Sequence, residues 1–159
     1  MDRINVAFML NGQRVELSLN PERTLLDVLR TEFGLTGAKS ACEAGHCGAC
    51  KVIIDGSAVV SCLVPMRTMQ GRSVLTIEGL AKGGTLHPLQ RAFVECGAVQ
   101  CGYCIPGMIL TAKALLDINP VPSEEQVRLA ISGNLCRCTG YKKQVDAILL
   151  AAKWMGGSA

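Results

Sequence analysis

The sequence has few aromatic residues and no long apolar run, and both absences restrict what the chain can be. Aromatic residues are 4% of the 159 residues, with Trp154 the single tryptophan, so the core must be built from Leu, Ile, Val, Ala and Met. Small cores of this kind often depend on a metal centre for stability. The longest apolar stretch, residues 105–116, is broken by Lys113, so no membrane span is expected.

The N-terminal segment also lacks the pattern of a secretory leader. Its apolar run at residues 6–10 is shorter than the core of such a leader, and no twin arginine is present. We therefore expect a cytoplasmic location, where clustered cysteines bind metal more often than they form disulfides. The net charge is only +3, and the Lys and Arg residues are scattered, so nucleic-acid binding is not supported.

Apolar residues are abundant for a chain that would exist alone. They make up 49% of the sequence, and the mean hydropathy is +0.30. Large exposed apolar patches usually mark interfaces between proteins. The composition therefore predicts surface that is covered by partner subunits.

Cysteine is the residue around which the chain is organised, and the first four form one set. Their spacing, C-x4-C-x2-C followed by one more Cys, is that of a plant-type 2Fe–2S cluster. Gly45 and Gly48 lie inside this short loop and supply the backbone freedom that three ligands around one cluster require. The expected metal ligands of this set are Cys42, Cys47, Cys50 and Cys62.

Four more cysteines form a second set with the spacing C-x2-C-x31-C-x1-C. Both of its pairs lie just before predicted helices, whose N-termini favour an anionic thiolate site. Spacing alone leaves a four-thiolate zinc site open here, because zinc also uses C-x2-C pairs. The expected metal ligands are Cys101, Cys104, Cys136 and Cys138, and Cys96 is the odd thiol, expected to be a small buried hydrophobe.

The first half of the chain has the pattern of a small α+β unit. Two alternating β-branched runs flank Asn11-Gly12, the strongest short signal for a hairpin. A helical pattern and three further strands follow, with Asp55-Gly56 as a second turn. The expected strands are residues 3–10, 13–19, 51–55, 57–63 (carrying Cys62) and 74–77, and the expected helix is 24–33.

The second half has a helical pattern throughout. Ser123 and Gln126 form a capping box, and Pro106 lies where a helix should begin. Four helices without strands predict a four-helix bundle. The expected helices are residues 88–96, 105–118, 123–132 and 141–155, and the predicted domains are 1–78, a glycine-rich linker 79–85, and 86–159.

Three stretches together resemble the small iron–sulfur subunit of the molybdenum hydroxylases, the xanthine dehydrogenase and aldehyde oxidoreductase family. They are C-E-A-G-H-C-G-A-C, V-Q-C-G-Y-C-I-P-G-M and G-N-L-C-R-C-T-G-Y, which occur in family order and with their intervals cover nearly the whole chain. The resemblance implies an N-terminal β-grasp, plant-type ferredoxin-like domain, a C-terminal helical domain, and two 2Fe–2S clusters.

The resemblance also implies partners and a role. The partners would be a large subunit with molybdopterin and a medium subunit with FAD, in a heterotrimer able to dimerise. This chain would pass electrons from the molybdenum centre through both clusters to FAD and perform no bond chemistry. The G-A-V-Q-C-G-Y-C run is most similar to members that act on N-heteroaromatic rings or purines, with aldehyde-acting and aryl-CoA-acting members as the alternative.

The resemblance gives Gln100 a role as a cofactor-binding residue. In the family, the glutamine of V-Q-C-G lies against the pterin ring system, and a side-chain amide offers the donors and acceptor that a pterin edge requires. From the residues alone, Gln100 reads equally well as a solvent-facing loop residue.

The chain departs from the family pattern at two positions. His46 stands where a glutamate is common, and Ile105 where a threonine is common. We interpret both as drift at solvent-facing loop positions. The alternative is that the loss of an anion beside Cys47 raises the potential of that cluster.

Three other functions fit parts of the pattern. A structural protein with two zinc ions would be colourless, whereas a 2Fe–2S protein is red-brown. A thiol–disulfide catalyst would use a C-x-x-C pair at the start of a helix, but the pair at Cys47 and Cys50 leads into a strand. A free-standing two-cluster ferredoxin needs no partners, and the high apolar content argues against it.

Overall fold

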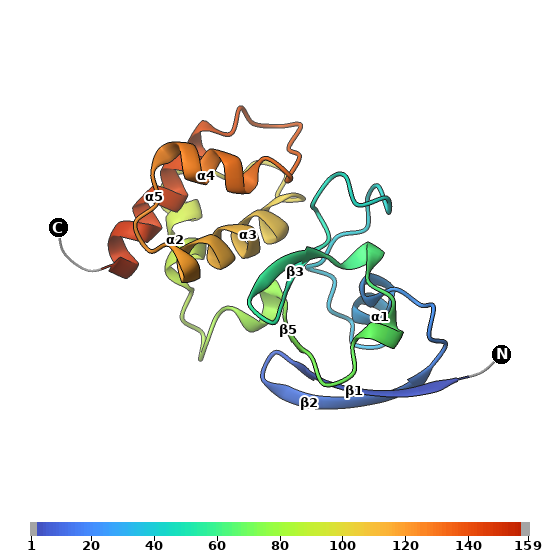
Figure 1. Ribbon diagram of the computed structural model, residues 1–159. Helices are drawn as coiled ribbons and strands as arrows, with labels where there is room; N and C mark the ends of the chain where they lie inside the picture. The colour runs from blue at the N-terminus through green and yellow to red at the C-terminus, as the bar shows by residue number, and fades with distance from the viewer. Residues whose placement is uncertain (1–2, 157–159) are drawn as a thin grey trace.

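The computed structural model describes residues 3–156 and has an α+β architecture, with a five-stranded sheet in its first half and four helices in its second (Figure 1). Residues 1–2 and 157–159, which the predicted domain limits include, lie outside the described residues. The strands are β1 Ile4–Leu10, β2 Gln13–Leu19, β3 Lys51–Ile54, β4 Ser57–Val60 and β5 Ser73–Leu75. The helices are α1 Leu25–Thr31, α2 Pro88–Glu95, α3 Ile105–Ile118, α4 Glu124–Ile131 and α5 Lys142–Gly156.

The sheet has the strand order β2-β1-β5-β3-β4, and only the β1–β5 pair is parallel. Both predicted hairpin turns are confirmed. Asn11 and Gly12 have φ angles of 51° and 83°, and Asp55 and Gly56 have φ angles of 47° and 86°. Two consecutive positive φ values define the turn that matches the twist of a hairpin.

Helix α1 lies across the sheet and closes the first core (Figure 1). Thr24 caps it, because its side chain accepts a hydrogen bond from the Asp27 N–H at 3.2 Å. The apolar side chains of α1 are buried against strands β1, β3 and β5, where Phe8 packs edge-on against Phe33. This core is aliphatic almost throughout, as the low aromatic content predicts.

Helices α2 to α5 form a second core, and α3 also packs on the sheet. Helix α2 lies along α5, and α4 contacts both α3 and α5. Helix α3 touches strand β3, where Leu110 and Ala114 pack against Ile53. The two halves of the chain therefore share a packed junction, and the cysteine loops lie beside it.

The predicted strand over residues 57–63 is wrong for its second part. Strand β4 ends at Val60, and Cys62 lies in a 3-10 turn, Ser61–Leu63. The register explains the difference: Val60 pairs with Lys51, so residues beyond it would have to pair with the cysteine loop, which is not a strand. The turn is held instead by the Ser61 hydroxyl, which donates to the Cys50 carbonyl at 2.6 Å.

Other boundaries differ by a few residues. Strand β5 ends before Thr76, because the Thr76 N–H donates to the Asn11 side chain at 2.8 Å instead of to a strand. Helix α5 begins after Tyr141, whose φ of 64° is incompatible with a right-handed helix. The Ser123–Gln126 capping box and the limits of α3 are confirmed as predicted.

Within residues 3–156, no helix is long and apolar enough to cross a membrane.

Candidate iron–sulfur centres

The first cysteine loop folds back on itself through left-handed backbone positions. Gly45 and Gly48 have φ angles of 78° and 71°, as the sequence predicts, and Glu43 adds a third positive value of 52°. This path aims backbone N–H groups at a sulfur: those of Ala44 and Cys47 donate to the Cys42 Sγ at 3.5 and 3.4 Å. Such N–H···S contacts stabilise a thiolate and tune the potential of a cluster bound to it.

The two ends of this set differ in their electrostatics. The N–H groups of Ala44 and Cys47 lower the pKa of the Cys42 thiol to about 6, and Cys42 is exposed. Burial raises the pKa of the Cys62 thiol to about 11, and its interaction with the Cys50 side chain adds to the effect. Metal binding to Cys62 therefore requires the loss of a proton from a buried thiol, whereas Cys42 loses its proton more easily.

The second set lies where the chain enters two helices, as predicted. Cys104 is the N-cap of α3, and burial raises its pKa to about 12, with its contact to Cys136 contributing next. Burial alone would also raise the pKa of Cys136, but hydrogen bonds from the Thr139 side chain (3.1 Å) and from backbone N–H groups outweigh it and lower that pKa. In each set, hydrogen bonds to one sulfur thus favour the thiolate form of that cysteine.

Tyr141 fixes the backbone at Cys136. Its hydroxyl oxygen accepts a hydrogen bond from the Cys136 N–H at 2.7 Å and lies 3.4 Å from the Cys136 carbonyl oxygen. The positive φ of Tyr141 turns its ring back onto this loop. The backbone strain at Tyr141 is therefore linked to a structural role, because Tyr141 fixes the backbone of Cys136, a predicted ligand.

The structure places cysteines of the same predicted set near one another in pairs. Cys42 interacts with Cys47, and Cys50 with Cys62. In the second group Cys104 interacts with Cys136, and Cys138 with Cys101.

A 2Fe–2S cluster requires four cysteine ligands, two for each iron, which is the number of cysteines in each predicted set. Within residues 3–156, no three His, Cys, Asp or Glu side chains are placed to hold a metal ion as they stand. All nine cysteines are free thiols.

The two ligand loops contact each other directly. The Leu135 N–H, one residue before Cys136, donates to the Cys47 carbonyl at 2.9 Å. The Tyr103 hydroxyl, between Cys101 and Cys104, donates to the Ser40 carbonyl. Segments far apart in sequence thus lie side by side, and each predicted cluster site borders the other.

Two glycines make this contact possible. A Cβ atom on Gly48 would lie 2.2 Å from the Gly133 carbonyl oxygen, and one on Gly107 would lie 2.4 Å from the Gly48 carbonyl oxygen. Both neighbours are backbone atoms, so the clash could not be relieved by a side-chain rotation. Gly107, on the first turn of α3, was not predicted from the sequence, where it reads as an ordinary helical glycine.

The other residues of interest in the sequence fall in different environments. Gln100 is exposed on the loop before Cys101, and His46 is exposed as expected. Ile105 is half-buried against the helical core, so its interpretation as solvent-facing was wrong. Cys96 is half-buried at the C-terminal cap of α2, less enclosed than predicted, and burial raises its pKa.

Asn134 was not predicted from the sequence, yet it is 1% exposed and joins the two loops through its side chain. Its amide Nδ2 donates to the Gly48 carbonyl at 3.2 Å, and its Oδ1 accepts from the Thr111 hydroxyl at 3.0 Å. The signal was present in the G-N-L-C-R-C stretch, where a polar amide precedes an apolar residue and a ligand. Only the fold shows what it contacts.

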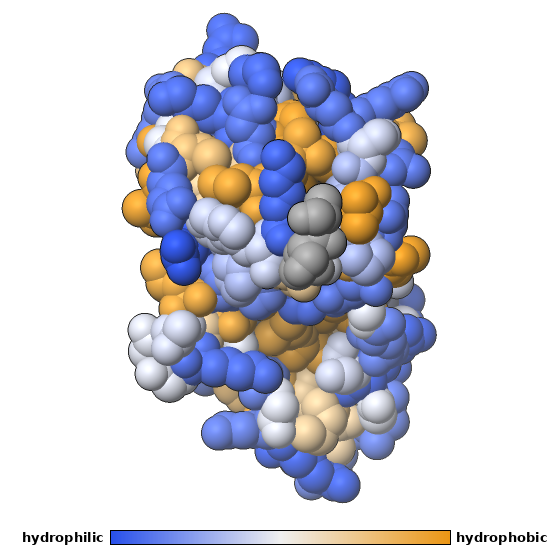
Figure 2. Space-filling model, turned by 90° about the vertical axis from the view of Figure 1, so that its left-hand side faces the viewer, coloured by the Kyte–Doolittle hydropathy of each residue, from blue (hydrophilic) through white to orange (hydrophobic). Residues whose placement is uncertain are grey.

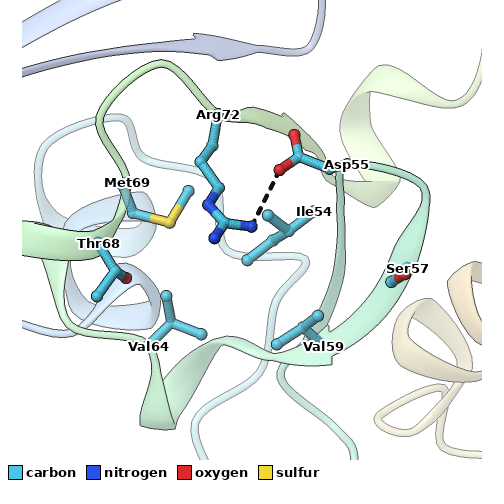
Figure 3. Close-up of a pocket in the computed structure, with 8 residues that line it drawn as sticks. All are labelled: Ile54, Asp55, Ser57, Val59, Val64, Thr68, Met69 and Arg72. Carbon is cyan, nitrogen blue, oxygen red and sulfur yellow. Dashed lines mark hydrogen bonds and ion pairs between the residues drawn. The ribbon is translucent and has the colours of Figure 1, made fainter.

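One cavity beside helix α1 reaches a predicted ligand, and another lies at the sheet. A cavity of about 410 Å³ is lined by Cys62 together with Ser40 and Glu43 of the first loop. A second cavity, of about 300 Å³, has apolar walls and an ion pair between Arg72 and Asp55 at 3.1 Å (Figure 3). No cysteine lines the second cavity, so it is separate from both cluster sites.

Two families of iron–sulfur domains match the chain. The family described as "2Fe-2S iron-sulfur cluster binding domain" matches residues 8–86. The family described as "[2Fe-2S] binding domain" matches residues 76–149. With two matched domains and a four-thiol group in each, the chain is a 2Fe–2S protein that carries two clusters.

Similar proteins of known role match over nearly the full length. The small FeS subunit of nicotinate dehydrogenase from Eubacterium barkeri is 48% identical over 96% of this chain and 98% of its own length. The small subunit of nicotine 6-hydroxylase from Paenarthrobacter nicotinovorans is 46% identical over 98% of this chain and 93% of its own length.

Two solved structures share the fold. The aldehyde oxidoreductase of Desulfovibrio gigas superposes with a TM-score of 0.93 at 47% identity, over 97% of this chain but only 17% of that one. Quinoline 2-oxidoreductase from Pseudomonas putida 86 superposes with a TM-score of 0.91 at 41% identity, over 99% of both chains. The chain therefore belongs to the family of small iron–sulfur subunits of the molybdenum hydroxylases, in which its role is electron transfer.

Proposed function

We propose that this chain conducts electrons from a molybdenum centre to FAD through two 2Fe–2S clusters. The first cluster is held by Cys42, Cys47, Cys50 and Cys62, and the second by Cys101, Cys104, Cys136 and Cys138. The proposal is supported by the direct contact of the two cysteine loops, in which the Leu135 N–H donates to the Cys47 carbonyl at 2.9 Å, and by the pairing of cysteines within each set.

The residues of the chain hold and separate the two sites. When bound, each cluster accepts and passes on one electron at a time. The N–H groups of Ala44 and Cys47 donate to the Cys42 sulfur, and Thr139 donates to the Cys136 sulfur, so both loops stabilise added negative charge. Cys101, Cys104, Cys136 and Cys138 would hold the cluster nearer the molybdenum centre, and Cys42, Cys47, Cys50 and Cys62 would hold the cluster nearer FAD.

The partners are a large subunit that holds molybdopterin and a medium subunit that holds FAD, in a heterotrimer able to dimerise. Apolar side chains beside both ligand loops support docking there: Leu63 is 56% exposed, Leu135 56% and Tyr103 46%. Exposed apolar side chains also occur on the helical side of the molecule, where they interrupt the hydrophilic surface (Figure 2). A chain that carries such surface fits a multi-subunit complex better than a free-standing ferredoxin.

The substrate class we propose for the complex is an N-heteroaromatic ring or a purine. The support is that the small subunits of nicotinate dehydrogenase and nicotine 6-hydroxylase match as separate chains along nearly their whole length. The aldehyde oxidoreductase of Desulfovibrio gigas is about as identical in sequence, so aldehyde oxidation is the second candidate. Activity of the co-purified complex towards nicotinate and towards an aldehyde separates the two.

The finer organisation is part of the same proposal. Residues 1–78 form the ferredoxin-like β-grasp domain, 79–85 the linker, and 86–159 a four-helix bundle. The separate cores of the two halves support this division, although Leu80 of the linker already packs in the helical core. The location is cytoplasmic, where nine free thiols would remain reduced until metal binds.

Iron analysis tests the proposal. The purified chain is expected to contain four irons and four acid-labile sulfides, to be red-brown, and to give two distinct electron spin resonance signals on reduction. Replacement of Cys104 by serine should remove two irons and one signal, because it removes one of the four ligands proposed for the second cluster. A colourless protein with zinc, or a single signal with half the iron, would contradict the two-cluster assignment.

Gln100 is proposed to contact the pterin in the assembled complex. It is exposed on a loop held at both ends: the Gln144 side chain donates to the Ala98 carbonyl at 2.8 Å, and the Tyr103 hydroxyl donates to Ser40. A loop anchored in this way presents an exposed amide in a fixed position.

Replacing Gln100 with alanine should leave pterin groups unpaired, at a cost of about 1–3 kcal/mol in cofactor retention, with both clusters assembled. Cofactor content and iron content of the purified complex are the measurements. Gln13→Ala, at an exposed position on β2, is the matched control and should change neither. If cofactor retention and the electron-transfer rate were unchanged in Gln100→Ala, Gln100 would not contact the pterin.

A further inference from the structure

Gln144 is a buried amide in the first turn of α5, and it bonds the loop that leads into the second ligand set. Its side chain belongs to a residue that is 0% exposed. The Nε2 atom donates to the Ala98 carbonyl oxygen at 2.8 Å, 46 residues earlier in the chain. This contact joins the helix that follows Cys138 to the segment that precedes Cys101.

Ala98 is the last anchored residue before Cys101. Its N–H donates to the Phe93 carbonyl at 2.9 Å and its carbonyl accepts from Gln144, so both of its backbone groups are paired. Ala98 is 0% exposed, whereas Gln100 and Cys101 are exposed. Among the residues that the structure describes, the three that follow Ala98 make no hydrogen bond between backbone groups. The path of the chain through Gln100 into Cys101 therefore depends on how Ala98 is held.

The Gln144 amide has one usable orientation, and that orientation leaves an atom without a partner. Within residues 3–156, the buried Oε1 has no hydrogen-bond partner. Turning the amide over would place Oε1 against the Ala98 carbonyl, so that two acceptors would face each other and the bond from Nε2 would be lost. A buried polar atom without a partner destabilises the folded chain. An apolar side chain would avoid that cost, so the contribution of the amide at this position is its N–H donor.

The start of α5 also fixes the other half of the second ligand set. The hydroxyl of Tyr141, the residue just before α5, accepts from the Cys136 N–H at 2.7 Å. Tyr141 and Gln144 therefore contact the backbone at Cys136 and before Cys101, which are two separate parts of the same proposed cluster site.

We propose that Gln144 is a positioning residue, which holds Cys101 at the second cluster and Gln100 towards the pterin by bonding the Ala98 carbonyl. The inference rests on the proposed two-cluster function and on the proposed role of Gln100. Gln144 is fully buried and acts only through the backbone of the segment that it anchors. The orientation of a ligand, and of the backbone around its sulfur, tunes the cluster that it binds.

Hydrogen exchange of the full chain, followed by mass spectrometry, tests the anchor. In Gln144→Leu the Ala98 carbonyl loses its donor, so the loop should open and let water pair with that carbonyl. Amide exchange in residues 99–101 should become faster by about tenfold, because this segment would open without global unfolding. The midpoint of denaturant unfolding should change little, since the variant removes one unpaired acceptor, Oε1, and creates another.

Electron spin resonance of the same variant tests the link to the cluster. Cys104→Ser identifies which signal belongs to the second cluster. In Gln144→Leu that signal should change its g values, while the other signal and the content of four irons should stay as in the unchanged chain. A residue that only filled the core would not alter one signal selectively.

Gln70→Leu is the matched control. The Gln70 Oε1 accepts from the Ala7 N–H at 2.9 Å, so this variant also removes a bond between a glutamine side chain and the backbone, in the first half of the chain. It should leave exchange in residues 99–101 and the second signal unchanged. Gln144→Met also lacks the donor and provides the test if Gln144→Leu does not fold.

Each outcome decides the proposal. Faster exchange in residues 99–101 together with a selective change in the second signal supports it. Unchanged exchange, faster exchange with an unaltered second signal, or a change in both signals with a large fall in the unfolding midpoint would overturn it, and the two-cluster function would stand. Absence of the second signal from the unchanged chain would overturn the proposed function and this inference together.

Discussion

Replacing Cys42 with serine is expected to stop electrons from reaching FAD in the assembled complex, while the molybdenum centre still accepts electrons from substrate. Cys42 is exposed, and its sulfur receives two backbone N–H groups that stabilise a thiolate. Serine is a poor iron ligand at neutral pH because its hydroxyl stays protonated. The first cluster should therefore be lost, and rapid-mixing absorbance should show FAD reduction reduced to background.

The matched control for this variant is Cys96→Ser. Cys96 lies at the end of α2 and is not one of the eight predicted ligands. It should keep four irons, both resonance signals and normal FAD reduction, with only a small loss of stability from packing. If Cys42→Ser reduced FAD at the normal rate, the proposed order of the clusters would be wrong; loss of a cluster in Cys96→Ser would show that the ligand assignment is wrong.

The second large effect is expected from Gly107→Ala. Alanine in a helix is normally favoured over glycine by about 1 kcal/mol. Here the added methyl would lie 2.4 Å from the Gly48 carbonyl oxygen. Because the obstacle is backbone, the first ligand loop has to move, and the free energy of unfolding should fall by about 1–3 kcal/mol.

Gly156→Ala supplies the comparison, since Gly156 is also helical but a Cβ there would meet nothing closer than 3.9 Å. It should be neutral or slightly stabilising in denaturant unfolding. Gly107→Ala should also slow electron exchange between the clusters, because the loop it displaces accepts the hydrogen bonds from Leu135 and Asn134. A stability gain in Gly107→Ala would mean that the junction is looser than its geometry indicates.

The sequence alone determined the features that depend on neighbouring residues. Asn11-Gly12 makes a hairpin turn, Ser123 caps α4, and α3 begins beside Pro106, because each of these preferences acts over three or four residues. The spacing of the cysteines predicted two sets of four in the same way. A ligand loop must contain its thiols at short intervals, and those intervals can be read directly.

Only the tertiary structure decided how the two sets relate to each other. Cys62 lies in a turn and not in a strand because β4 runs out of partner residues where the ligand loop begins. Lys51 meets Asn134 across 83 residues because α3 packs on β3 and brings the second ligand loop against the first. Such contacts depend on the packing of two cores, and no pattern within a short stretch of sequence encodes their distance or direction.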